Sequence, residues 1–264
     1  MAKKKDAAEG AEEKSRGKSV FWAVFNLLAT IVAAVALGVT LIAAGFGACA
    51  AVPLTTTALS QAFSGTSNDE TPFSHAELVK AANATRDYTV ADNDREALYE
   101  VLHEINDEAL TPYADSTDQE LLAADDAYTL DEDALSHLDD VYSVVTTARN
   151  VLIVVALLAL AACAHVGIRK GRRSLGRVFG VAGFCVLVFF ACLAVWVAVD
   201  FTGFFAIFHS LFFSAGSWYF ASDSLLITMY PTPFWIGMGV VWLVVTVALC
   251  LAVMAIGRRL RRRK

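Results

Sequence analysis

The amino-acid sequence predicts an all-α integral membrane protein with four transmembrane helices and a small helical extracytoplasmic cap domain. Hydrophobic residues make up 56% of the 264 residues, a larger share than soluble globular proteins carry. Four apolar runs are long enough to cross a bilayer, whose hydrocarbon core requires about 20 helical residues. Charged residues are also sorted along the chain, because basic residues flank these runs and acidic residues fill the region between the first two.

The apolar runs and the basic residues together set the expected topology. We predict transmembrane helices at residues 19–52, 144–168, 178–199 and 234–256. Six Lys or Arg residues precede the first span, five lie in the loop 169–177, and six follow the fourth span. Basic residues near the ends of spans mark the cytoplasmic side. We therefore expect a multi-pass protein of the cell membrane with both termini in the cytoplasm.

Both terminal tails are basic. Residues 1–18 mix Lys, Glu, Gly and Ala without apolar periodicity, which predicts a disordered cytoplasmic tail whose basic residues attract anionic lipid headgroups. The Arg-rich tail 257–264 suggests nucleic acid binding, but it directly follows a span, where a basic segment is typical of a topology anchor. We expect membrane lipids as partners and no nucleic acid, and the sequence leaves the oligomeric state open.

Residues 53–143 form the predicted cap, an acidic helical region on the outer side. They contain 21 Asp and Glu against three basic residues. Sequences of the capping-box type, in which a hydroxyl and a carboxylate satisfy each other's free backbone amides, begin at Ser74 and Thr129. No Pro or Gly interrupts the chain between Thr129 and Gly167. The last helix of the cap is therefore expected to continue into the second span, over about 57 Å.

The segment 200–233 is apolar and aromatic, but Gly and Pro residues interrupt it. Non-helical backbone is tolerated at membrane depth only where protein or a water-filled cavity surrounds it. We expect an interfacial or re-entrant element on the outer side instead of a fifth span, with Trp218 and Tyr219 at the level of the lipid headgroups.

His137 is the first candidate for chemistry. Its place on a helix puts Asp133 and Asp140, at i−4 and i+3, on the same face. A carboxylate beside an imidazole fixes its tautomer and raises its basicity, as a general base near neutral pH requires. The non-catalytic interpretation is a solvated histidine on the surface of an acidic helix.

His209 is the second candidate. It lies in a stretch with no charged residue between Asp200 and Asp223, where an ionisable group is costly unless it is paired or used. The non-catalytic interpretation is an interfacial imidazole bonded to a backbone carbonyl. Because His137 and His209 are both expected on the outer side, a joint site is predicted. No pair of histidines has the close spacing of a helical zinc site, and we expect no metal and no cofactor.

The residues around the two histidines resemble the bacterial lipoprotein intramolecular transacylase (Lit) family. The resemblance rests on His-Leu-Asp-Asp-Val at 137–141, on Phe-His-Ser-Leu-Phe-Phe at 208–213, and on Trp218, Asp223 and Pro231 before the last span. It extends from about Ser74 to Trp235 and includes the order of the four spans. Tyr142 departs from the family pattern, in which a basic residue is expected.

The resemblance implies a membrane acyltransferase of the bacterial cell membrane. Such an enzyme moves the sn-2 acyl chain of a diacylglyceryl-modified lipoprotein onto the α-amino group of its N-terminal cysteine, which gives a lyso-form lipoprotein. The catalytic histidines of the family correspond to His137 and His209. We hypothesise that His137, oriented by Asp140, is the general base and that His209 donates a proton, with the reverse assignment also open.

The remaining expected site residues fall into two groups. Further support for the histidines is expected from Asp133, Asp200 and Asp223, and contacts to substrate are expected from Phe205, Phe208, Phe212, Trp218 and Arg149. Two other functions are compatible with the sequence. One is a non-catalytic membrane protein whose acidic cap binds a partner, and the other is a membrane esterase that releases the acyl chain to water.

Overall fold

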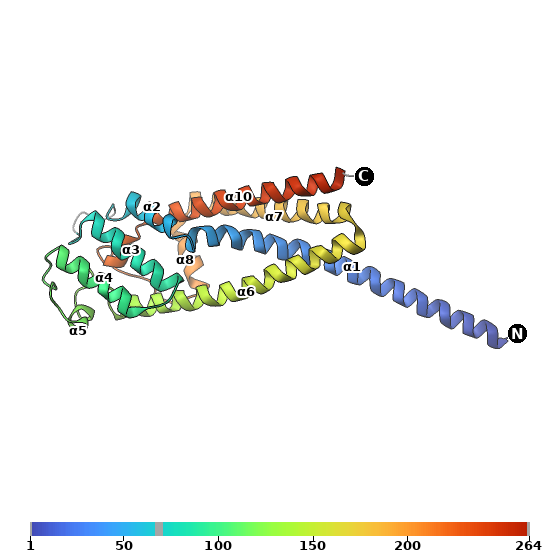
Figure 1. Ribbon diagram of the computed structural model, residues 1–264, viewed down its shortest axis with the longest axis horizontal. Helices are drawn as coiled ribbons and strands as arrows, with labels where there is room; N and C mark the ends of the chain where they lie inside the picture. The colour runs from blue at the N-terminus through green and yellow to red at the C-terminus, as the bar shows by residue number, and fades with distance from the viewer. Residues whose placement is uncertain (1, 67–70, 263–264) are drawn as a thin grey trace. The chain divides into compact units, whose positions relative to one another are not determined.

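The computed structural model describes residues 2–66 and 71–262, and it describes side chains from Val20 onward. This part of the chain folds into ten α-helices and contains no strand, which confirms the all-α fold class (Figure 1). The helices are α1 Ala2–Ala50, α2 Pro53–Phe63, α3 His75–Val90, α4 Arg95–Glu108, α5 Asp118–Leu122, α6 Glu132–Lys170, α7 Arg172–Val199, α8 Phe201–Ser210, α9 Leu225–Met229 and α10 Thr232–Arg262. The last two residues of the expected tail 257–264 lie outside the described residues.

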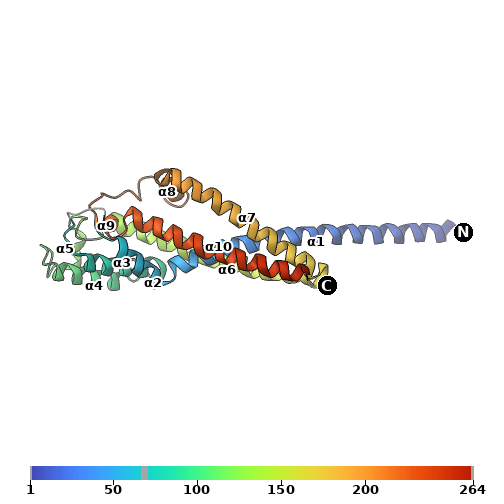
Figure 2. The same ribbon diagram turned by 90° about the horizontal axis from the view of Figure 1, so that it is seen from above.

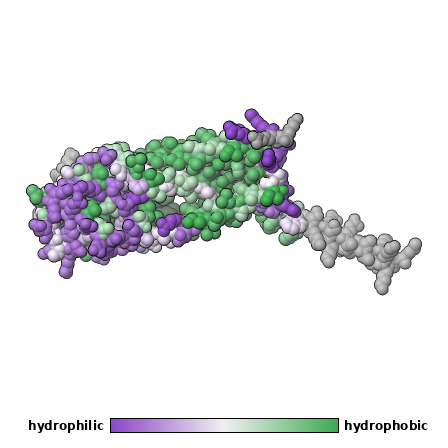
Figure 3. Space-filling model, in the orientation of Figure 1, coloured by the Kyte–Doolittle hydropathy of each residue, from purple (hydrophilic) through white to green (hydrophobic). Residues whose placement is uncertain are grey.

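Four helices are long and apolar enough to cross a membrane, as predicted. They are Val20–Ala50 of α1 and the helices α6, α7 and α10. Helix α8 is apolar but has only 10 residues, so the described residues contain no fifth span. The helices α2 to α5 belong to the acidic region 53–143 and are called the acidic helices below. On the face drawn in Figure 3, hydrophobic residues cover the long helices and hydrophilic residues cover the acidic helices.

Helix α6 runs without a break for 39 residues. The absence of Pro and Gly before Gly167 predicts its continuity up to that residue, and the helix then continues through Gly167 to Lys170. At about 1.5 Å per residue its length is about 59 Å. The capping box at Ser74 and Glu77 is confirmed, but the one expected at Thr129 and Glu132 is wrong. Helix α6 begins at Glu132 itself, and Asp131 caps it, because its Oδ1 accepts from the amide of Ala134 at 2.9 Å.

Helix α1 extends back to Ala2, through the tail 1–18 that we expected to be disordered. The expectation rested on the lack of apolar periodicity in this tail. Its residues are largely Ala, Lys and Glu, however, which have high intrinsic helix propensity. A helix here needs no buried face, so the missing periodicity did not exclude it. The side chains of residues 2–19 are outside the description.

The chain divides into two compact units. The first contains residues 1–42, 152–189 and 248–264. Its core brings small and branched side chains together from three helices: Ala33 of α1, Ala162 and Val166 of α6, and Val178 of α7. Small residues let helix backbones approach closely in a membrane, where packing and not the hydrophobic effect drives association.

The second unit contains residues 43–151 and 190–247. Its core is built from α3, α4, the first turns of α6, and α9, with Leu78, Leu102, Leu135 and Met229 fully buried. Figure 2 shows α8 after the end of α7 and a long connection from α8 to α9. The far end of that connection lies against the loop between α5 and α6, because the amide of Leu225, the first residue of α9, donates to the carbonyl of Asp126 at 2.8 Å.

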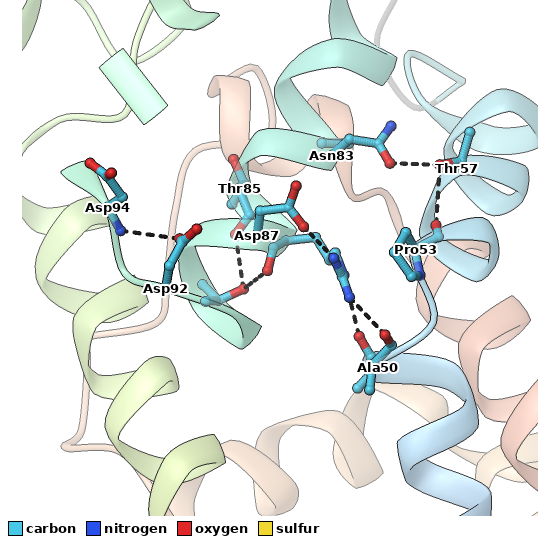
Figure 4. A network of polar contacts seen from close by, with 12 residues as sticks. Ala50, Pro53, Thr57, Asn83, Thr85, Asp87, Asp92 and Asp94 are labelled. Atoms are coloured by element: carbon cyan, nitrogen blue, oxygen red, sulfur yellow. Dashed lines mark hydrogen bonds and ion pairs between the residues drawn. The ribbon is translucent and has the colours of Figure 1, made fainter. Parts of the chain in front are cut away.

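A polar network joins the end of α1 to the acidic helices (Figure 4). The guanidinium of Arg86 on α3 donates from Nη2 to the carbonyl of Ala51 at 2.9 Å and from Nε to that of Ala50 at 3.4 Å. These carbonyls follow the last turn of α1, where a cation is electrostatically favoured. The hydroxyl of Thr57 on α2 donates to Oδ1 of Asn83 on α3 at 2.7 Å. Helix α3 is therefore tied to both α1 and α2.

Candidate active site

The two candidate histidines meet in the second unit. His137 lies in the second turn of α6 and His209 near the end of α8. Their ring centroids are 6.2 Å apart, and the ring planes are inclined by 30°. The joint site expected from the sequence is therefore present as a geometric arrangement of two imidazoles.

The backbone of α8 orients the ring of His209. Its Nδ1 lies 2.9 Å from the carbonyl oxygen of Phe205, one turn earlier in the helix. A carbonyl oxygen only accepts, so Nδ1 must carry the hydrogen, and the lone pair of the neutral ring lies on Nε2. The side chain is half-buried. Burial lowers the pKa of His209 below its ordinary value of 6.5, although the hydrogen bond to Phe205 opposes this effect.

The non-catalytic interpretation of His209 predicted this hydrogen bond to a backbone carbonyl. The bond does not exclude a catalytic role, because it leaves Nε2 with a free lone pair. The nearby ring of His137 distinguishes this site from an isolated interfacial histidine, since two imidazoles are able to accept and donate a proton within one reaction.

The ring of His137 is buried, with only 8% of the residue exposed. Its Nδ1 has no hydrogen-bond partner within residues 20–66 and 71–262. A buried polar atom without a partner costs about 1–3 kcal/mol. A substrate atom that hydrogen-bonds to this nitrogen would remove that cost.

The carboxylates expected beside His137 are not hydrogen-bonded to it. Asp133 and Asp140 are both exposed, and neither forms a hydrogen bond to His137 among the described side chains. The spacing places their Cβ atoms near His137, but an ionised carboxylate remains hydrated unless the protein supplies partners for it. The neighbouring Asp139 has such partners, since it accepts from Tyr88, from Asn93 at 3.2 Å and from Arg95 at 3.2 Å.

Aromatic rings enclose both imidazoles. Phe205 and Trp218 lie 4.0 and 4.9 Å from His209, measured between ring centroids. Phe213 contacts both histidines, at 4.8 Å from His137 and 5.7 Å from His209, and Phe220 lies 5.6 Å from His137. The indole Nε1 of Trp218 is buried, and the described residues offer it no hydrogen-bond partner.

Phe213 and Phe220 were missed by the sequence analysis. Phe213 follows His209 by four residues, and that spacing was an available signal because such residues share a helix face. Phe220 had no such signal, because it lies in the irregular connection between α8 and α9. Tertiary structure alone brings it to His137.

Four of the expected site residues lie away from the imidazoles. Asp200 is the N-cap of α8, where it accepts from the amide of Gly203 at 2.8 Å, and roughly 13 Å of helix separates it from His209. Asp223 is exposed and raises the pKa of Asp126, after the larger effects of burial and of two other carboxylates. Arg149 is exposed, about 18 Å along α6 from His137. Phe212 is 49% exposed, and its ring contacts those of Phe208, at 5.3 Å, and Phe213, at 6.3 Å.

Phe208 lies on the rim of the site. Its ring is 5.6 Å from that of His209, and the residue is 39% exposed. Among the described residues, no three His, Cys, Asp or Glu side chains are grouped so that they would hold a metal ion. The functional groups at this site are two imidazoles, an indole N–H and the apolar surfaces of aromatic rings.

Comparison with known proteins identifies relatives of this arrangement. The family described as lipoprotein intramolecular transacylase Lit matches residues 68–235, which contain both histidines. No curated protein matches the sequence.

Solved structures of the membrane-integral lipoprotein intramolecular transacylase Lit from Bacillus cereus share the fold. One has a TM-score of 0.66 at 15% identity, covering 90% of this chain and 96% of that chain. Variants of the same protein with one histidine replaced by arginine or by alanine each have a TM-score of 0.62 at 15% identity; the match covers 93% and 92% of this chain, respectively, and 96% of each variant. At this identity the likeness shows the fold, while the family match covers more than half of the sequence. The chain therefore belongs to the lipoprotein intramolecular transacylase (Lit) family.

Proposed function

We propose that this chain moves the sn-2 acyl chain of a diacylglyceryl-modified lipoprotein onto the α-amino group of its N-terminal cysteine, and that His137 and His209 carry the proton transfers. The observation that supports this most directly is the pair of imidazoles, 6.2 Å apart, inside a ring of aromatic side chains. The product is a lyso-form lipoprotein.

The reaction needs few groups from the protein. The amine, whose ordinary pKa is about 8, loses a proton as its nitrogen attacks the ester carbonyl carbon. The new C–N bond forms, the tetrahedral oxyanion collapses, and the C–O bond to glycerol breaks. The proton removed from the amine ends on the glycerol oxygen, so one imidazole is able to accept it and return it. No covalent enzyme intermediate is required.

We assign the role of base to His209, which reverses the assignment first hypothesised from the sequence. Its neutral ring holds the free lone pair on Nε2, and its pKa is lowered by burial. His137 then donates to the developing oxyanion, because its buried Nδ1 lacks a partner. Asp140, exposed and not bonded to His137, does not take part in orienting it.

Trp218 supplies a second donor in this proposal. Its ring lies beside that of His209, and its buried Nε1 also lacks a partner among the described residues. Donors fixed in a dry site stabilise an oxyanion more strongly than water does, because they need not reorganise as the charge develops. Trp218 therefore acts through its N–H in addition to its apolar surface.

Positioning supplies much of the acceleration. The amine and the ester belong to one bound molecule, so holding the two in contact turns the transfer into an intramolecular step with a high effective concentration. Phe205 and Phe208 offer apolar surface for the migrating acyl chain beside His209. The exposed ring of Phe212 continues that surface outward.

We place the acidic helices and the site on the outer side of the membrane, with both termini in the cytoplasm. Support comes from the basic residues in the loop 169–177 and after α10, which favour the cytoplasm. An amine reagent that does not cross membranes is expected to modify Lys80 in intact cells and to leave Lys170 unmodified. Modification of Lys170 under these conditions would contradict this orientation.

Mass spectrometry of the N-terminal peptide of a model lipoprotein tests the proposed reaction. Purified protein in neutral detergent is expected to move one acyl chain to the amine without a change in total mass, which fragmentation of the peptide localises. Loss of the acyl mass would identify an esterase instead. An unchanged peptide would leave a non-catalytic protein whose acidic helices bind a partner.

A further inference from the structure

The first unit contains a cavity with features that acyl transfer does not use. The cavity has a volume of about 360 Å³ and opens between α7 and α10 near their basic ends. Three guanidinium groups surround it, from Arg177, Arg258 and Arg261. Its remaining wall is apolar and is formed by Val181, Phe184 and Met254.

Two glycines set the width of this cavity. A Cβ atom on Gly176 would lie 2.5 Å from the carbonyl oxygen of Gly257, and one on Gly257 would lie 2.8 Å from the carbonyl oxygen of Gly176. The two backbones are therefore in contact at this point, as in other close helix crossings in membranes. The contact holds the arginine of α7 and those of α10 at a fixed spacing.

The space beside Gly180 is open. A Cβ atom there would meet only Nη2 of Arg261, at 4.0 Å. Gly180 therefore forms a gap in the wall of α7 that faces a guanidinium group. A Cβ atom at this position therefore meets no backbone atom of α10 within 4 Å.

None of the three arginines forms an ion pair with any described side chain. The parts of this unit whose side chains are described, within residues 20–42, 152–189 and 248–262, contain no Asp or Glu. Guanidinium groups that converge without a counter-charge repel one another. The planar guanidinium group suits a phosphate, because two of its N–H groups are able to donate to two phosphate oxygens at once.

We propose that this cavity binds the phosphate headgroup of an anionic phospholipid, with Arg177, Arg258 and Arg261 on the phosphate and the acyl chain along Val181, Phe184 and Met254. A free phosphate ion offers the same oxygens to the guanidinium groups. The lipid is the better match, because a free ion leaves the apolar wall without a partner. Basic pockets between membrane helices are a recurrent setting for such headgroups.

Lipid binding to the purified full-length protein tests this proposal. In neutral detergent, native mass spectrometry is expected to show a phosphatidylglycerol molecule retained and phosphatidylcholine not retained. The double variant Arg177→Gln/Arg261→Gln is expected to weaken retention about tenfold or more. The matched control Arg172→Gln/Arg173→Gln removes the same number of charges, both from α7 and both from outside the cavity, and it is expected to bind as the unaltered protein does.

Gly180→Leu separates a shaped site from general attraction to basic residues. It fills the cavity and keeps every charge, so weaker retention is expected here too. Retention that Gly180→Leu leaves unchanged, or that both arginine pairs weaken equally, would overturn the proposal. Competition by inorganic phosphate at the same concentration as the lipid would identify a free ion as the occupant and would also overturn it. Unchanged acyl transfer by each variant confirms that it is folded and keeps this test separate from the proposed reaction.

Discussion

Phe205 holds His209 in two ways at once. Its ring lies 4.0 Å from the imidazole, and its carbonyl oxygen accepts from Nδ1 of the same imidazole at 2.9 Å. The backbone fixes which nitrogen carries the hydrogen, and the ring limits how far the imidazole is able to turn. Nε2, the nitrogen that we propose as the base, is thereby held in one orientation before any substrate binds.

Replacement of His209 by Asn tests its role as base. The amide nitrogen of Asn is able to take the place of Nδ1 and to keep the bond to Phe205, but nothing replaces Nε2. We expect conversion to fall by about 10²- to 10⁴-fold, the usual contribution of a general base, as measured by mass spectrometry of the N-terminal peptide. His103→Asn is the control, because His103 pairs with Asp118 outside the site. This variant should convert substrate at the rate of the unaltered protein. Full conversion by His209→Asn would remove His209 from the mechanism.

The pH dependence of conversion should follow the neutral form of His209. Since burial lowers the pKa of this group below 6.5, the neutral ring predominates at pH 7 and is lost as the pH falls through the lowered pKa. Protonation of the substrate amine, whose pKa is about 8, lowers kcat/KM as the pH falls below that value. Beyond this loss we expect a second decrease with an apparent pKa below 6.5, and an initial-rate series in buffers from pH 4 to 9 would measure both. Absence of the second decrease, or its occurrence above 6.5, would argue for another base.

Trp218→Phe tests the donor role of the indole. The variant keeps an aromatic ring beside His209 and removes only the N–H. We expect kcat to fall about 10- to 100-fold, somewhat less than the loss of a dedicated oxyanion donor, with little change in KM. Trp235→Phe is the matched control, because its ring contacts Phe205 at 6.2 Å and its Nε1 is not among the buried donors that lack a partner. Equal kcat values for the two variants would assign Trp218 a packing role only.

Two neighbouring acids should behave differently when replaced by Ala. Asp139 accepts from three side chains, and its loss leaves Tyr88, Asn93 and Arg95 without that partner. We expect Asp139→Ala to lower the free energy of unfolding by about 1–3 kcal/mol, seen as a lower thermal midpoint in detergent. Asp140→Ala should change neither the midpoint nor the conversion by more than a small factor. A large loss of conversion with Asp140→Ala would restore the orienting role first expected for it.

The sequence was sufficient wherever one local pattern decided the outcome. Uninterrupted apolar runs predicted the four spans, and the lack of Pro and Gly from Thr129 to Val166 predicted the continuity of α6 over that stretch. His137 and His209 were singled out because an imidazole in those surroundings is unusual, and the structure brings their rings together. Local spacing was not sufficient for Asp140, since whether a carboxylate turns inward depends on partners from other helices. The contacts of Asp139 require Tyr88 on α3 and Arg95 at the start of α4, which no pattern around Asp139 reveals.

The same limit applies to the rings around the site. Phe220 lies beside His137 in a connection whose far end is held by two hydrogen bonds of α9: the amide of Leu225 donates to the carbonyl of Asp126, and the carbonyl of Thr228 accepts from the amide of Gly65. The identity of the protonated nitrogen in His209 likewise follows from its hydrogen bond to Phe205. Such facts come from distances and not from residue types.

The contact of Arg86 with the end of α1 places unequal demands on the two partners. Both acceptors are main-chain oxygens, of Ala50 and Ala51, so almost any side chain at those positions would leave the contact intact. Arg86 itself has no such freedom, because a lysine offers no fork of donors to reach two carbonyls. In distant relatives, an arginine at this one position of α3 should therefore mark the contact between the first span and the acidic helices, even where other residues replace Ala50 and Ala51.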